Sequence, residues 1–184
     1  MATASPACRV ILIGMMGSGK TTIGHLLSEE TGWPYVDNDE LVQRSHGLTS
    51  RKIVARQGEA KLREAETSAL ALGLELSAPV IIGVAAGTIL DPANRHRMEV
   101  GGIVVWLRAD AATLVSRAMD LSHRPFVHTA GGDWLAATVS ERMPLYRSVA
   151  NLIVDTDAGT PDDAVRTIRA HVESIPACRD VAVP

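Results

Sequence analysis

One segment constrains the fold more than any other: residues 14–21 read Gly-Met-Met-Gly-Ser-Gly-Lys-Thr and fit the pattern G-x-x-x-x-G-K-[ST]. An unbroken aliphatic run, Val10–Ile13, precedes the segment, and the helix-favouring stretch Thr21–Glu30 follows it. A glycine-rich turn between a strand and a helix can point its backbone N–H groups at phosphate oxygens, and the start of the helix adds partial positive charge. The segment therefore predicts a phosphate-binding loop at the end of a buried strand.

The side chains of this loop have distinct expected roles. The Lys20 ammonium would reach the β- and γ-phosphates of ATP, and the Thr21 hydroxyl would bind Mg²⁺. We expect the nucleotide to be bound by Gly14, Gly17, Ser18, Gly19, Lys20, Thr21 and Thr22. The alternative is a glycine-rich structural turn whose lysine is only solvated, and the flanking strand and helix argue against it.

Apolar runs alternate with helix-favouring stretches along the chain, which is typical of α/β proteins. We expect strands at 10–13, 34–36, 79–84, 103–107 and 151–155. We expect helices at 21–30, 49–76 with a break at Gly58, 92–99, 111–119, 134–147 and 161–174. The prediction is a single domain over residues 1–184, a three-layer α/β/α fold with five parallel strands.

Residues 121–133 have mixed polarity, a proline and a glycine pair, so we expect a loop there that acts as a mobile lid. Arg124 lies in this segment. An arginine that closes over the γ-phosphate would neutralise the charge that develops during phosphoryl transfer. Residues 175–184 are expected to form a C-terminal tail.

The composition fits a globular domain and argues against two classes of partner. Hydrophobic residues make up 46% and charged residues 21% of the chain, as in ordinary soluble domains. The net charge is -3 and no dense Lys/Arg tract occurs, so we expect no nucleic-acid binding. The apolar run at 10–16 is too short to span a bilayer, so we expect no membrane association. We also expect a monomer.

The two cysteines, Cys8 and Cys178, lie near opposite ends of the chain. No secretory signal is recognisable, so we expect a reduced, cytoplasmic setting. In that setting both cysteines would be free thiols rather than a disulfide framework.

Two carboxylates follow the second expected strand. Asp37 and Asp39 flank Asn38 at the carboxyl end of that strand, where ligands of open α/β sheets collect. At a spacing of two in an extended segment, both side chains can face the same way. One could hold Mg²⁺ and the other could accept a hydrogen bond from a substrate hydroxyl. Capping of a helix that begins near Glu40 is an equally good interpretation.

Two further arginines have more than one interpretation. Arg63 lies between Glu59 at i−4 and Glu66 at i+3, so its default role is an ion pair on a helix surface. Arg142 follows Glu141 and, taken alone, reads as surface charge. Guanidinium groups also bind carboxylates in a bidentate manner, so a buried pair would indicate an anionic substrate.

Several motifs together resemble the shikimate kinase family, and the resemblance covers the chain from Arg9 to about Val172. They are GMMGSGKTTIG at 14–24, VDNDELV at 36–42, GEAKLREAE at 58–66, RPFV at 124–127 and ERMPLYRSVA at 141–150. The resemblance implies a nucleoside-monophosphate-kinase-like fold with sheet order 2-3-1-4-5 and a lid. It also implies transfer of the γ-phosphoryl group of ATP to the 3-hydroxyl of shikimate.

The resemblance also implies roles for single residues. Asp39 matches the residue that holds the substrate hydroxyls, and Asp37 the residue near Mg²⁺. The carboxylate of shikimate would be bound by Arg63 and Arg142, beside Ala86 and Gly87. Near the nucleotide, Arg124 matches the lid arginine, Arg117 the arginine beside the adenine, and Pro161 the loop that borders the adenine. The catalytic residues would be Lys20, Asp39 and Arg124.

The chain departs from the family pattern in two places. Ala85-Ala86-Gly87 stands where the family carries three consecutive glycines, and Val54 and Leu62 stand where it has phenylalanines. Alanine tolerates negative φ and resists positive φ, so the first change is either harmless or reshapes the pocket. Two alternatives to a shikimate kinase therefore stay open: a kinase of a related carboxylated polyol or cyclitol such as gluconate, and a catalytically silent nucleotide-binding paralogue.

Overall fold

A computed structural model describes the backbone of residues 8–119 and 126–179, and the side chains of these residues outside 118–133. Five parallel strands form one sheet in the order β2-β3-β1-β4-β5. The strands are β1 (Arg9–Ile13), β2 (Tyr35–Asp37), β3 (Val80–Gly83), β4 (Ile103–Arg108) and β5 (Leu152–Asp155). The predicted fold class and strand order are confirmed.

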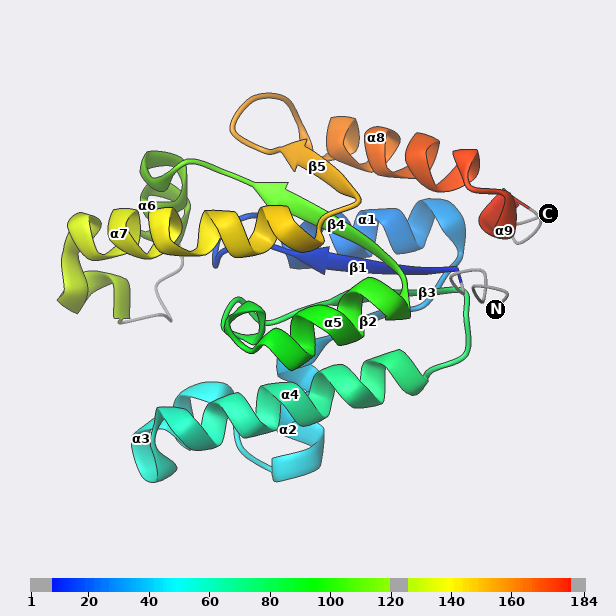
Figure 1. Cartoon of the computed structure of the whole chain (residues 1–184). Coiled ribbons are helices and arrows are strands. Elements are labelled where there is room, and N and C mark those ends of the chain that lie inside the picture. Colours follow the sequence, from blue (N-terminus) through cyan, green and yellow to red (C-terminus); the bar gives the residue numbers. More distant parts are fainter. Residues whose placement is uncertain (1–7, 120–125, 180–184) are drawn as a thin grey trace.

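Helices cover both faces of the sheet because the buried strands carry apolar side chains on both sides (Figure 1). Val10 and Leu12 of β1 pack in one core cluster with residues of α1 and α8. Ile11 and Ile13 pack in a second cluster with residues of α4, α5 and α7. The alternation along β1 places the two clusters on opposite faces of the sheet, as the period of a strand requires.

The helices are α1 (Lys20–Thr31), α2 (Asn38–His46), α3 (Ser50–Gln57), α4 (Glu59–Glu75), α5 (Pro92–Gly101), α6 (Ala111–Met119), α7 (Phe126–Val149), α8 (Pro161–Ser174) and α9 (Pro176–Arg179), with a 3₁₀ turn, η1, at Thr88–Leu90. Every expected helix has a counterpart, and α2 and α9 are additional to the expected list. The predicted break at Gly58 is confirmed, because this glycine separates α3 from α4 with φ at 87°.

A third, smaller apolar cluster joins α2, α3 and α4 away from the sheet. It contains Val42, Ile53, Leu62, Ala65 and Ala69. Farther along α4, Leu70 packs in the cluster on the sheet. Helix α4 therefore connects this small cluster to the cluster on the sheet.

The prediction for residues 121–133 is wrong in part. Helix α7 begins at Phe126, whereas the sequence prediction began it at Trp134. The helix passes through the glycine pair at 131–132, which costs helical stability without preventing the helix. Residues 120–125, with Arg124, lie outside the described residues, so the lid stays a prediction.

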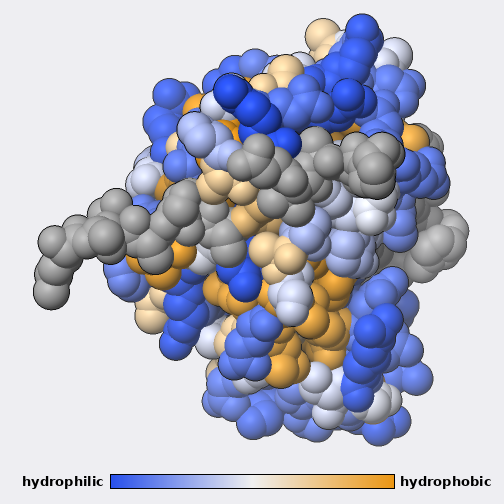
Figure 2. Space-filling view, turned by 90° about the vertical axis from the view of Figure 1, so that its right-hand side faces the viewer, coloured by the Kyte–Doolittle hydropathy of each residue, from blue (hydrophilic) through white to orange (hydrophobic). Residues whose placement is uncertain are grey.

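The prediction of two free thiols is wrong as well. Cys8 and Cys178 form a disulfide, with their Cα atoms 5.2 Å apart. Sequence distance misleads here, because α9 returns to the side of the sheet on which β1 starts (Figure 1). Cys178 also lies in α9, so the first part of the predicted tail includes a helical turn whose Cys178 is buried. Figure 2 looks onto this side of the molecule, where hydrophobic residues gather near the centre between hydrophilic margins.

In the parts of the chain that the structure describes, no helix is both long enough and apolar enough to cross a membrane.

Candidate active site

A cleft of about 1070 Å³ opens at the carboxyl ends of the central strands. We call the part formed by the loop after β1 with Arg117, Thr156 and Pro161 the nucleotide end, after the ligand predicted to bind there. We call the part formed by Asp39, Arg63, Ala86, Gly87 and Arg142 the acceptor end, after the predicted acceptor of the phosphoryl group. The cleft is lined by nearly all of the predicted site residues: Gly17, Ser18, Gly19, Lys20, Thr21, Thr22, Asp37, Asp39, Arg63, Ala86, Gly87, Arg117, Arg142 and Pro161.

The loop after β1 has the backbone that a phosphate cradle requires. Gly14, Gly17 and Gly19 have φ angles of 148°, 83° and 93°, a region that favours glycine. The Lys20 ammonium donates to the carbonyl oxygens of Gly14 and Met15, at 2.9 and 3.0 Å. The lysine is thereby held along the loop at the start of α1.

Two predicted loop residues are placed differently from the rest. Gly14 does not line the cleft, and a Cβ there would stand 2.5 Å from the carbonyl oxygen of Leu107, so this glycine seats the loop against β4. Ser18 lines the cleft, but its hydroxyl oxygen is buried and has no hydrogen-bond partner within the described chain. A phosphate oxygen would satisfy such a group.

Asp37 is the centre of a hydrogen-bond network between the two ends of the cleft. Its Oδ1 accepts from the backbone N–H of Asp39 at 2.9 Å, which makes it the N-cap of α2. Its Oδ2 accepts from the hydroxyls of Thr21 at 3.2 Å and Tyr35 at 2.9 Å. The capping interpretation is confirmed for Asp37. Its predicted role near Mg²⁺ is compatible with this position and stays a prediction.

Asp39 lies in the first turn of α2, so the prediction of an extended segment through both aspartates is wrong. The cap at Asp37 starts the helix one residue later, at Asn38. Asp39 is nevertheless exposed in the cleft, and its Oδ1 accepts a hydrogen bond from the Ser50 hydroxyl at 2.7 Å. The start of α3 therefore orients the carboxylate predicted to meet the substrate hydroxyl.

Tyr35 is a site residue that sequence reasoning missed. Its ring occupies space left by two glycines: a Cβ on Gly24 would lie 2.3 Å from the ring, and one on Gly83 2.3 Å from the hydroxyl. Burial raises the pKa of Tyr35, and the negative Asp37 raises it further. The hydroxyl thus stays a proton donor to Asp37 at any physiological pH. No local motif marks this role, because it depends on three separate elements.

The donor set of Thr21 and Asp37 fits Mg²⁺. A hydroxyl oxygen and a carboxylate oxygen lie 3.2 Å apart at the rim of the phosphate loop. Mg²⁺ prefers oxygen ligands and is commonly held by one or two protein groups together with substrate phosphates. A third protein ligand is therefore not required.

Both guanidinium groups of the acceptor end lie against the loop that follows β3. Arg142 donates from Nη1 to the carbonyl oxygen of Ala86 at 3.2 Å, and its buried Nε has no partner among the described residues. Arg63 lies so close to Gly87 that a Cβ there would be 1.6 Å from Nη1. The missing side chain of Gly87 is what allows Arg63 to reach this loop.

Arg63 also makes both ion pairs that its spacing predicts. It contacts Glu59 at 2.6 Å and Glu66 at 2.7 Å. Burial lowers the pKa of the Arg63 guanidinium, but the two glutamates outweigh burial and raise it on balance. Burial raises the pKa of the Glu66 carboxyl, and Arg63 offsets only part of that rise. Arg63 can therefore be ion-paired and still line the cleft, because Glu66 contacts its guanidinium group from the buried side.

The replacement of two family glycines by Ala85 and Ala86 leaves the backbone unstrained. No non-glycine residue in the described chain has a positive φ. Ala86 keeps its carbonyl oxygen available to Arg142 and to the Tyr146 hydroxyl, which donates to it at 3.0 Å. Val54 and Leu62, which stand where the family has phenylalanines, both line the cleft. Among the described residues that line it, only Trp134 is aromatic.

The far side of the nucleotide end comes from α6 and the segment before α8. Arg117 donates to the hydroxyl of Thr156 at 3.2 Å and to its carbonyl oxygen. Thr160 caps α8 in a reciprocal arrangement with Asp163, and Pro161 is the first residue of that helix. These contacts give the wall a fixed shape beside the phosphate loop, as expected for a surface that borders a nucleotide base.

The phosphate loop, the parallel sheet with order 2-3-1-4-5 and the arginine-lined acceptor end define a P-loop kinase of a small molecule. The particular family follows from the sequence: a family model described as shikimate kinase matches residues 16–173. The chain belongs to the shikimate kinase family.

Similar proteins agree with this assignment. A shikimate kinase from Oleidesulfovibrio alaskensis is 42% identical over 153 residues, which cover 80% of this chain and 87% of that protein. A solved shikimate kinase from Acinetobacter baumannii, in complex with shikimate, has a TM-score of 0.84 at 29% identity and covers 92% of this chain and 95% of its own. A gluconokinase from Sinorhizobium meliloti has a TM-score of 0.56 at 18% identity, covering 97% and 94%, so it shares the fold alone.

Proposed function

We propose that this chain transfers the γ-phosphoryl group of ATP to the 3-hydroxyl of shikimate, giving shikimate 3-phosphate and ADP. The observation that supports this most strongly is the meeting of Arg63 and Arg142 at the Ala86–Gly87 loop, across the cleft from the phosphate loop. Two guanidinium groups at one place suit a carboxylate on the acceptor. A hydroxyl on the same molecule could then face the terminal phosphate.

The proposed reaction forms a bond between the acceptor oxygen and the γ-phosphorus and breaks the bond from that phosphorus to the β-phosphate oxygen. Asp39 would orient the acceptor hydroxyl and take its proton. Lys20 would move from the loop carbonyls to the phosphates and stabilise their charge. We assign Arg124 to the same task on the strength of its RPFV motif.

Thr21 and Asp37 would hold Mg²⁺, and Tyr35 would fix the orientation of Asp37. When bound, the cation would neutralise charge on the phosphate oxygens. The adenine would lie between Arg117 and Pro161. These assignments are supported by the lining of the cleft, which includes Thr21, Asp37, Arg117 and Pro161. We further propose that the enzyme acts as a monomer and in the cytoplasm, where its ATP is available.

The experiment is a coupled assay of ADP release with a panel of hydroxylated acids, including shikimate, gluconate and other cyclitols. We expect turnover with shikimate and at least a hundredfold lower kcat/KM with gluconate, since a ring and an open chain present their hydroxyls differently to the same clamp. Turnover with gluconate and none with shikimate would assign the chain to the polyol kinases instead.

Binding is measured in the same samples by tryptophan fluorescence. Trp134 is 45% exposed and lines the cleft, whereas Trp33 and Trp106 are 4% and 3% exposed, so a change on adding ligand reports on the cleft. Nucleotide binding without turnover of any acid would identify a silent paralogue.

A further inference from the structure

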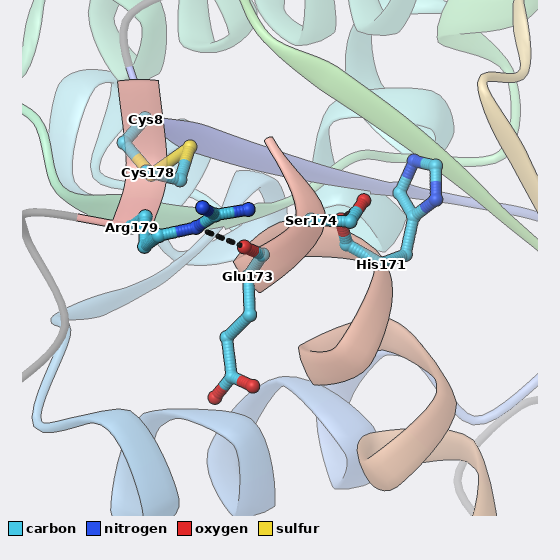
Figure 3. Close-up of a disulfide and its surroundings, with 6 residues drawn as sticks. All are labelled: Cys8, His171, Glu173, Ser174, Cys178 and Arg179. Atoms are coloured by element: carbon cyan, nitrogen blue, oxygen red, sulfur yellow. Dashed lines mark hydrogen bonds between the residues drawn. A yellow bond between two sulfur atoms is a disulfide. The ribbon is translucent and has the colours of Figure 1, made fainter. Parts of the chain in front are cut away.

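The disulfide joins the two ends of the folded chain inside the core. Cys8 directly precedes β1, and Cys178 lies in α9, separated from it by 170 residues in sequence. The two residues are 3% and 1% exposed and belong to the apolar cluster formed by β1, α1 and α8. Figure 3 shows the bond beside the end of α8, where Arg179 donates to the carbonyl oxygen of Glu173 at 3.3 Å.

The disulfide lies at the start of β1 and just after the end of α8, and the opposite end of each of these two elements borders the nucleotide end of the cleft. β1 runs directly into the phosphate loop, and α8 begins at Pro161, which lines the cleft. Along its length α8 packs on α1, with Ile168 and Leu27 in the same cluster and an ion pair from Arg169 to Glu30 at 3.3 Å. The disulfide therefore anchors the end of a helix whose start helps to shape the nucleotide site.

A small cavity reaches the disulfide from one side. It holds about 120 Å³, and Cys178 is one of its lining residues. Trp33, whose indole nitrogen is buried and has no partner in the described chain, lines it as well. Arg169 stands in the same lining together with its ion-pair partners Glu30 and Glu173, whereas Cys8 does not line this cavity. The sulfur of Cys178 is thus the one that a small thiol would meet.

We propose that Cys8 and Cys178 form a reversible redox site whose oxidised state stabilises the fold and strengthens nucleotide binding through α8. The reductant is a dithiol. One of its thiolates attacks Sγ of Cys178, the bond between the two cysteine sulfurs breaks, and Cys8 leaves as a thiolate that takes up a proton. The second thiol of the reductant then displaces Cys178 from the mixed disulfide. The dithiol is oxidised to a disulfide and both cysteines become thiols.

The consequence for stability follows from the length of chain that the bond closes. A cross-link between distant residues restricts the unfolded chain more than a short loop does. Reduction also releases α9 from the start of β1, so the end of α8 loses its covalent anchor. In a compartment that keeps thiols reduced, such a bond acts as a sensor rather than as a permanent staple.

The experiment compares the oxidised wild type with the same protein reduced by dithiothreitol. These are the only two cysteines in the chain, so thiol titration of the unfolded protein should find none before and two after reduction. We expect reduction to lower the melting temperature by about 10 °C. We also expect it to raise the Kd for ADP, measured by calorimetry below both melting temperatures, about fivefold or more.

The matched control is the double variant Cys8→Ala, Cys178→Ala, which should resemble the reduced wild type and ignore dithiothreitol. Oxidised dithiothreitol at high ratio should restore the original values in the wild type only. Failure of the wild type to form the disulfide under oxidising conditions, or equal melting temperatures in the oxidised and reduced states, would overturn the redox site. A melting shift with unchanged ADP affinity would overturn the coupling to the cleft. None of these measurements involves the acceptor. A negative result would therefore contradict the redox site without contradicting the proposed function.

Discussion

The nucleotide end of the cleft is built mainly from one continuous stretch of chain, whereas the acceptor end is assembled from side chains of three helices, α2, α4 and α7, and from the loop after β3. In the phosphate loop, the positive φ angles of Gly14, Gly17 and Gly19 set the shape through the backbone. At the acceptor end, two functional side chains are held by other side chains: Ser50 orients Asp39, and Glu66 holds Arg63. The first end therefore depends on local conformation and the second on tertiary contacts.

Because of this difference, we expect substitutions at the two ends of the cleft to have different effects. A change in the phosphate loop should remove one function and leave the acceptor site intact. A change at the acceptor end should propagate to neighbours that never touch the substrate. Four predictions test the distinction, beginning with the largest effect.

Replacing Lys20 by Ala should lower kcat by about a thousandfold, because a charge that stabilises the transferring phosphoryl group is lost. Steady-state kinetics measures the loss, and the fluorescence of Trp134 should still report shikimate binding. Shikimate binding that disappears together with turnover would contradict the independence of the two ends. Unchanged kcat would end the assignment of this lysine.

Replacing Gly87 by Ala should lower kcat/KM for shikimate by about a hundredfold, because the new Cβ would displace Arg63 and leave a charged partner unpaired. The matched control is Ala86→Gly, one residue away, which should change kcat/KM by less than about threefold because Ala86 has an ordinary backbone conformation. The Kd for ADP should stay the same in both variants. Equal effects of the two substitutions would show that Gly87 has no special role in placing Arg63.

Replacing Tyr35 by Phe should raise the Mg²⁺ concentration needed for half-maximal activity about tenfold, since the variant keeps the ring but removes the hydroxyl that orients Asp37. The KM for shikimate should change less. Titration of activity with Mg²⁺ at fixed ATP measures the effect. A change confined to shikimate would place Tyr35 with the acceptor end instead.

The smallest effect is a pH dependence of stability from Glu66. Burial raises its folded-state pKa above the ordinary value of 4.5, so the charged form costs free energy in the folded protein. That cost is absent below pH 4.5 and complete above the raised pKa. The stability of the wild type relative to Glu66→Gln should therefore fall as the pH rises through this window. Urea unfolding at a series of pH values measures it, and the opposite slope would contradict the burial of this carboxyl.

The strands of the sheet could be predicted from the sequence, because parallel strands that are buried on both faces consist of nearly continuous runs of apolar residues. Val10–Ile13 and Ile103–Leu107 lie within observed strands, and helix α8 has the predicted bounds. The start of α7 could not be predicted in this way. Glycines that indicate a loop are also tolerated inside a helix when tertiary packing supports it, and Leu135 and Val139 supply such packing.

The residues of the candidate site also differ in how far they could be predicted from the sequence. The loop residues could be predicted because one short motif contains them, and the arginines of the acceptor end because several motifs resemble one family. Tyr35 and the disulfide could not, because each depends on segments that meet only in the folded chain. The choice at Asp37 stayed open for the same reason: a cap and a ligand for a cation look alike in sequence.

The tight fit of Tyr35 against Gly24 and Gly83 has a consequence for how this enzyme can change over evolutionary time. The residues at these three positions constrain one another. A methyl group on either glycine would collide with the ring or hydroxyl of Tyr35, and a much smaller residue at position 35 would leave a void beside Asp37. A single substitution of either glycine, or of Tyr35 by a residue without an aromatic ring, should therefore be unfavourable. Viable descendants should keep both glycines and a ring at position 35, or change these positions together.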